Sequence, residues 1–177
     1  EPELGHYESA KADFDKAISM EPKNYDRLIE IYEALADYGY REVGQEYLQN
    51  VLNTDKKLDT YDSGRIYYYL GDYQKAYLAL EEAKGKGGVD SYLYLGKAYA
   101  ATGDYNYASS VYSNYLSKQG PDAEIYNQLG LCELAKKDYQ KALEAFQAGK
   151  QIEGNSLMQT LSFNEIVAYE YLQDYQK

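Results

Sequence analysis

The chain has 177 residues and a formal net charge of −11, with 29 acidic residues, 18 basic residues and one histidine. An acidic surface argues against nucleic acid and anionic lipid as partners, because both bind basic faces. One histidine and one cysteine exclude a His/Cys zinc site and any disulfide within the chain, so we expect neither a metal nor another cofactor. The apolar content of 45% predicts a folded core, and no apolar run approaches the ~20 residues of a membrane-spanning helix.

Tyrosine dominates the aromatic residues: the chain has 24 tyrosines, 3 phenylalanines and no tryptophan. A tyrosine ring covers apolar neighbours while its hydroxyl donates or accepts a hydrogen bond. This composition suits thin, half-exposed elements, or a surface that presents rings to a partner. The sequence opens on Glu1 rather than methionine, which indicates a processed or trimmed chain. The composition suits a bacterial cell-surface or lipid-anchored protein and a cytoplasmic protein equally well.

A short motif recurs along the whole chain. It stands at Gly71–Ala76 and Gly103–Ala108, and in degraded form at Lys137–Ala142. Gly5, Gly39 and Gln173 open further copies, so that the steps from one copy to the next are 34, 32, 32, 34 and 36 residues. A period of about 34 residues is typical of paired antiparallel helices stacked into a solenoid.

In chain order, this period predicts about ten helices in a single array over residues 1–177. Residues 1–24 supply a half repeat that consists of a second helix. Full helix pairs follow at residues 25–56, 57–88, 89–122 and 123–158. Residues 159–177 supply a final half repeat that consists of a first helix. The glycine that ends each first helix can adopt the left-handed conformation of a C-terminal cap. The residues Asp72, Asp104, Asp138 and Asp174 can then accept hydrogen bonds from the open amides of the next helix.

Small residues recur where the two helices of a pair approach each other. Gly96 and Gly130 each lie seven residues before the turn, at the end of a Leu-Gly dipeptide. In the second repeat this position holds Tyr32, and Gly44 replaces the alanine that follows the other turns. We therefore expect that bulk added to one helix is removed from its partner, as a packed interior requires.

Together these residues resemble the tetratricopeptide repeat, over essentially the whole chain. The matching positions after the turns are Ala10, Ala76, Ala108 and Ala142, followed four residues later by Phe14, Leu48, Leu80, Tyr112 and Phe146. The resemblance implies an all-α, right-handed superhelical solenoid of helix pairs. It also implies a non-catalytic protein-interaction scaffold, with a concave groove that is lined by the first helices and binds a protein or peptide.

Candidate groove residues are read from the first helices. Four carboxylates at spacings of four, three and four share one helical face and form an acidic end: Asp26, Glu30, Glu33 and Asp37. The middle of the groove is aromatic with two cations, and the end beyond it is neutral: Tyr61, Arg65, Tyr68, Tyr69, Tyr94, Lys97, Asn127 and Gln128. The rings would contact the partner, the two cations would anchor an acidic or C-terminal group, and the carboxylates would favour a basic residue.

Each of these assignments has an alternative. The carboxylate stripe also fits a solvated helix face, the tyrosines also fit packing, and Arg65 also fits an ion pair with Asp62. Cys132 is interpreted as a core thiol. A second functional hypothesis is structural self-association through apolar solenoid ends, which would give a homo-oligomer. An enzyme is disfavoured because the sequence offers no nucleophile–base pair.

Overall fold

The computed structural model describes residues 2–83 and 85–175, so positions 1, 84, 176 and 177 of the predicted array lie outside the described residues. Within these ranges the chain forms ten α-helices and no strand, as predicted. The helices are α1 (Pro2–Met20), α2 (Tyr25–Asp37), α3 (Arg41–Thr54), α4 (Thr60–Tyr69), α5 (Tyr73–Glu82), α6 (Val89–Ala101), α7 (Tyr105–Gln119), α8 (Ala123–Ala135), α9 (Tyr139–Lys150) and α10 (Met158–Tyr175).

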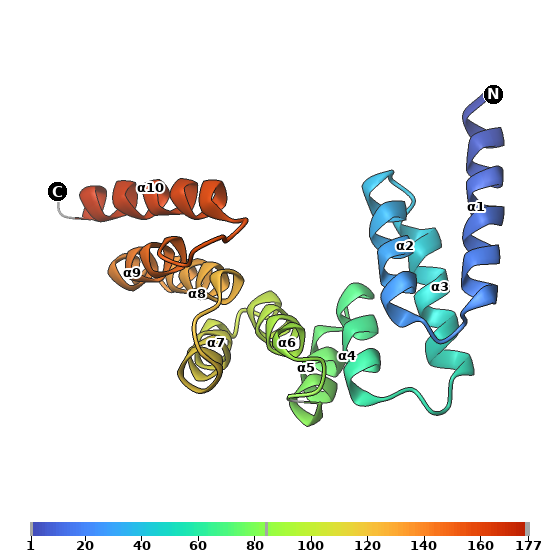
Figure 1. The fold of residues 1–177 in the computed structure, drawn as a ribbon, viewed down its shortest axis with the longest axis horizontal. Coiled ribbons are helices and arrows are strands. Elements are labelled where there is room, and N and C mark those ends of the chain that lie inside the picture. The colour runs from blue at the N-terminus through green and yellow to red at the C-terminus, as the bar shows by residue number, and fades with distance from the viewer. Residues whose placement is uncertain (1, 84, 176–177) are drawn as a thin grey trace.

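The helices stack in pairs into a curved array, with α1 at one end and α10 at the other (Figure 1). Helices α2, α4, α6, α8 and α10 lie along the inner side of the curve, and α3, α5, α7 and α9 lie along its outer side. The chain is therefore an all-α helical solenoid, in which the first helix of each pair faces inward.

The turns within the pairs have the predicted backbone conformation. Gly39, Gly71 and Gly103 have φ values of 86°, 80° and 82°, in the left-handed region that glycine adopts at little cost. Lys137 holds the same place in the degraded copy, with φ at 64°. The turn therefore keeps its geometry where the glycine is lost.

Side-chain caps follow two of these turns. The Asp72 carboxylate accepts a hydrogen bond from the backbone N–H of Lys75 at 3.3 Å, and Asp138 does the same for Lys141 at 3.2 Å. The cap predicted for Asp104 is wrong, since α7 has no side-chain cap. The Asp104 carboxylate instead accepts a hydrogen bond from the Thr102 hydroxyl, 3.0 Å away. This hydroxyl competes with the backbone amides of α7 for the carboxylate oxygens.

Two predicted turns are wrong. Helix α1 begins at Pro2 and passes through Gly5 without a break, and α10 continues through Gln173 to Tyr175, so Asp174 begins no new helix there. Proline fits the first helical turn, and a helix interior tolerates one glycine at a cost of about 1 kcal/mol. At Gln173 no glycine or proline interrupts the helix.

Within each later pair, a knob from the second helix fills a glycine slot on the first. The pairs are Gly64 with Leu80, Gly96 with Tyr112, and Gly130 with Phe146. A Cβ atom on Gly64 would lie 2.6 Å from Leu80 Cγ, so no side chain fits there without a shift. The three knobs are fully buried and form part of the core.

The second repeat inverts this arrangement, as predicted. Here the knob is Tyr32 on α2, and a Cβ on Gly44 of α3 would lie 2.8 Å from Tyr32 Cδ2. Elsewhere in the core, Cys132 is buried, and this burial raises the pKa of its thiol to about 11. The interpretation of Cys132 as a core thiol is thus confirmed.

Candidate functional site

Three rings meet on the inner side of the array. Tyr68 and Tyr69 end α4 and Tyr94 lies on α6, with ring centroids 5.3 to 5.8 Å apart; we call this set the tyrosine cluster. The Tyr69 hydroxyl donates to Glu33 Oε1 at 2.6 Å and lies 3.0 Å from the Tyr94 hydroxyl. Burial and these hydrogen bonds raise the pKa of Tyr69 above its usual value, so the phenol stays neutral. The cluster is a half-buried, fixed aromatic surface that joins α2, α4 and α6.

Arg65 is held between two helices by its own carboxylates. Its guanidinium lies 2.5 Å from Asp26 Oδ1 on α2 and 2.5 Å from Asp62 Oδ1 on α4, and its central carbon lies 4.5 Å from the ring centroid of Tyr61. Burial opposes its charge, but the hydrogen bonds to Asp26 and Asp62 hold the pKa of Arg65 above its usual value. Arg65 is only 6% exposed, so this cation ties α2 to α4.

Three of the predicted groove charges have no partner among the described residues. Glu30 and Asp37 on α2 are exposed, and Lys97 on α6 is half-buried. None of the three makes a hydrogen bond or an ion pair with the residues that the structure describes. Asp26 and Glu33 are exposed too, although Arg65 and Tyr69 bind them. Two of the four predicted carboxylates and one of the two predicted cations are therefore available to a ligand.

The neutral end is engaged in packing between helices. Asn127 on α8 is buried, and its Oδ1 accepts a hydrogen bond from Asn164 Nδ2 on α10 at 2.9 Å. Gln128 donates to Glu124 one turn earlier, at 2.8 Å. The structure thus joins seven of the predicted residues of α2, α4 and α6 through hydrogen bonds, ion pairs and ring contacts: Asp26, Glu33, Tyr61, Arg65, Tyr68, Tyr69 and Tyr94. Asn127 and Gln128 instead bind partners on α10 and α8.

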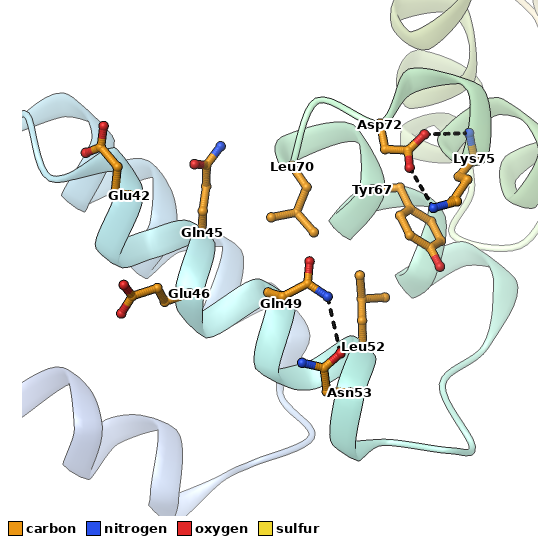
Figure 2. Close-up of a pocket in the computed structure, with 10 residues that line it drawn as sticks. All are labelled: Glu42, Gln45, Glu46, Gln49, Leu52, Asn53, Tyr67, Leu70, Asp72 and Lys75. Carbon is orange, nitrogen blue, oxygen red and sulfur yellow. Dashed lines mark hydrogen bonds and ion pairs between the residues drawn. The ribbon is translucent and has the colours of Figure 1, made fainter.

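A pocket of about 670 Å³ opens on the outer side, between α3 and the α4–α5 pair (Figure 2). We call it the outer pocket; its lining residues are Glu42, Gln45, Glu46, Gln49, Leu52, Asn53, Tyr67, Leu70, Asp72 and Lys75. Sequence reasoning missed it because it sought ligand-binding residues on the first helices. A signal was present: Gln45 lies 32 residues before Tyr77, so one repeat has an amide where the next has a ring.

Two further classes of site are absent from the described part of the chain. It holds no group of three or more His, Cys, Asp or Glu side chains placed to bind a metal ion. None of its helices combines the length and the apolar content that crossing a bilayer requires.

Comparison with known proteins agrees with the fold. Models of the tetratricopeptide repeat match residues 93–155 and 3–24. A tetratricopeptide repeat protein from Parabacteroides merdae ATCC 43184 is 14% identical with a TM-score of 0.65, covering 95% of this chain and 66% of that protein. PilF of Pseudomonas aeruginosa is 17% identical with a TM-score of 0.57, over 97% and 84% of the two chains. YrrB, a repeat protein with an unusual peptide-binding site, is 21% identical with a TM-score of 0.55, over 90% and 84%.

No curated protein matches the sequence. The chain spans 66% of the length of the Parabacteroides protein. At these identities, the solved structures establish the fold that the chain shares with them.

Proposed function

The chain is a tetratricopeptide repeat protein, and we propose that it is a non-catalytic scaffold that holds a segment of a partner protein on the inner face of α2, α4 and α6. The tyrosine cluster carries this proposal. It presents rings whose positions are already fixed by hydrogen bonds and ring contacts, so that binding orders few of the scaffold's own side chains. The likeness to YrrB supports a peptide as the class of ligand.

The charges beside the cluster define the kind of segment. Glu30 and Asp37 lie on the α2 side and favour a basic residue, and Lys97 lies on the α6 side and favours an acidic residue or a C-terminal carboxylate. Arg65 has a different role, because Asp26 and Asp62 already neutralise it. We therefore expect Arg65 to position Tyr61 and the helices, and Lys97 to be the cation that contacts the ligand.

The test is selection of binding sequences from an immobilised random peptide library by the purified protein. We expect wild type to select peptides with a basic residue, an apolar or aromatic residue and an acidic residue in a fixed order. Lys97→Met removes the preference for the acidic residue, and the double variant Glu30→Gln, Asp37→Asn removes the preference for the basic one, because each deletes the complementary charge.

Matched controls carry the same changes away from the inner face. Lys16→Met on α1 and Glu153→Gln after α9 change exposed residues, and we expect both to select the same peptides as wild type. Identical selection by wild type and by all inner-face variants would contradict the proposal, as would the absence of any selected peptide.

A second candidate function, self-association, is favoured by α10. Its Phe163 and Ile166 side chains are 66% and 57% exposed, three residues apart on one helical face. A second copy could cover this apolar face. Light scattering tests the idea: a dimer or larger oligomer of wild type that becomes a monomer in Phe163→Ser, Ile166→Ser supports it, and a wild-type monomer at all concentrations refutes it.

A further inference from the structure

One tyrosine closes the outer side of the junction between α5 and α6. The Tyr77 ring stacks on the Tyr99 ring with centroids 4.6 Å apart and an interplanar angle of 15°. The Tyr99 hydroxyl donates to Glu81 Oε1 at 3.0 Å. The space between an outer helix and the next inner helix is therefore filled here by a ring from the protein itself.

The preceding junction, between α3 and α4, lacks this ring. Counting back 32 residues, Gln45 and Gln49 stand at the positions of Tyr77 and Glu81, and Tyr67 stands at that of Tyr99. No ring among the described residues stacks on Tyr67; the Lys75 Nζ atom lies over this ring, 5.5 Å from its centroid. The outer pocket occupies the space that remains, with Tyr67 on one wall and α3 on the other (Figure 2).

Three carboxamides line the α3 wall at intervals of four residues: Gln45, Gln49 and Asn53. Gln49 Nε2 donates to Asn53 Oδ1 at 3.3 Å, and the Gln45 amide has no partner among the residues that the structure describes. A carboxamide both donates and accepts, which matches the alternating N–H and C=O groups of an extended peptide backbone. Residues at this spacing share one helical face over about 12 Å, the length of roughly four extended residues.

The charges around the outer pocket are mostly acidic. Glu42 and Glu46 lie on α3 and Asp72 lies on the opposite wall, where it pairs with Lys75 at 2.9 Å. One of the three carboxylates is thus offset by a cation of the chain, and two remain. An acidic rim attracts a segment with basic residues.

We infer that the outer pocket binds an extended segment of a partner protein that carries an aromatic residue flanked by basic residues. The partner's ring takes the place that Tyr77 fills in the next repeat and stacks on Tyr67. Its backbone pairs with the carboxamides of α3, and its basic residues lie beside Glu42 and Glu46. This site is separate from the inner face on α2, α4 and α6, so the protein has two places for peptide segments.

The probe for the test is the synthetic peptide acetyl-Lys-Tyr-Lys-amide, with binding followed by nuclear magnetic resonance shifts of the protein's backbone amides. We expect shifts on α3 and α4 around Gln45, Gln49 and Tyr67. In Gln45→Tyr the protein's own ring fills the pocket, so affinity falls about tenfold, as expected for the loss of one ring pair. The matched control Gln140→Tyr, an exposed position on α9, binds as wild type does.

The fold of Gln45→Tyr is checked by circular dichroism, and Tyr67→Leu gives a second variant that removes the ring without adding bulk. Equal affinity of wild type and both variants overturns the inference, and so does equal affinity for acetyl-Lys-Ala-Lys-amide. Shifts confined to α2 and α6 overturn it as well, because they place the peptide on the inner face. The variant Glu30→Gln, Asp37→Asn changes the inner face alone, so we expect it to bind the probe at the outer pocket as wild type does. The peptide-library selection described above tests the inner face, so the two proposals can fail independently.

Discussion

The junctions α3–α4 and α5–α6 are built on the same plan and differ on their outer sides. Both have buried apolar side chains between the helices, Ile66 with Leu48 in the first and Leu80 with Leu95 in the second. On the outer side, the second junction has the stacked rings of Tyr77 and Tyr99, whereas the first has a pocket of about 670 Å³. The ring of Tyr77 in the closed junction is replaced by the amide of Gln45 in the open one.

The difference shows where a repeat array can acquire a site at little cost. Each repeat contacts only its neighbours, so opening one junction leaves the packing of the others intact. On the inner side, the α2–α3 pair is still joined to α4, because Arg65 binds Asp26 and the Tyr69 hydroxyl binds Glu33. The outer pocket and the ordered inner face are therefore compatible in one pair of repeats.

The largest loss of stability in the closed region is expected from a change at Tyr112. This residue is fully buried against Gly96, in the core cluster that contains Leu95 and Ala98. Tyr112→Ala should lower the free energy of unfolding by about 3–5 kcal/mol, because it leaves a cavity. Urea unfolding measures the change. Tyr38→Ala, at a position 82% exposed, is the control and should stay within about 0.5 kcal/mol of wild type; equal losses in both variants would contradict the packing described.

The second-largest effect is expected from alkaline pH, which should destabilise the closed junction. Burial and the hydrogen bond to Glu81 raise the pKa of Tyr99 to about 12, from an ordinary value of 10.0. The unfolded chain therefore releases this proton first, so the stabilisation is complete below pH 10 and is lost as the pH rises to about 12. Urea unfolding across this pH range measures the loss, and Tyr99→Phe should reduce it. An equal decline in both proteins would show that other tyrosines dominate.

Converting the closed junction into an open one should lower the free energy of unfolding by less than Tyr112→Ala does. Tyr77→Gln copies the residue at Gln45 and removes the ring that stacks on Tyr99, so the free energy of unfolding should fall by about 1–2 kcal/mol. Its neighbour Leu78, which is 60% exposed, supplies the matched control Leu78→Gln, with a change near zero. If Tyr77→Gln unfolds at the same urea concentration as wild type, the stacked pair does not hold this junction closed.

The smallest effect concerns the turns within the pairs. Lys137 adopts a φ of 64°, in the region where Gly39, Gly71 and Gly103 lie. Lys137→Gly relieves the strain on a side chain in this conformation and should raise the free energy of unfolding by about 0.5–1 kcal/mol. Thermal unfolding measures the gain. Gly103→Lys should do the opposite, and a loss of stability in Lys137→Gly would argue that the lysine is not strained.

Local signals in the sequence predicted the fold well. The glycine turns and the exchange of bulk between Tyr32 and Gly44 depend on the backbone and on direct neighbours, which a repeat of known period places correctly. The ends were predicted less well. The turns expected at Gly5 and Gln173 are absent, because one glycine does not break a helix and Gln173 has no breaker beside it.

The candidate site was predicted only in part, because its chemistry depends on contacts between repeats. The sequence pattern places Arg65 on an inner helix, but only the structure shows that Asp26, 39 residues away, takes up its charge. The outer pocket exists because position 45 holds an amide and no ring. This absence is recognised only by comparison with the next junction, where the Tyr77 ring fills the corresponding space.

The open junction also bears on how the array unfolds. The stability of a solenoid is approximately a sum of repeat terms and nearest-neighbour interface terms, so a weak interface divides the array into separately cooperative units. Amide hydrogen exchange in the native state should therefore show α2 and α3 exchanging through an opening that leaves α5 to α9 protected. In that case, the ring that is absent at Gln45 sets the boundary between two cooperative units of one continuous chain.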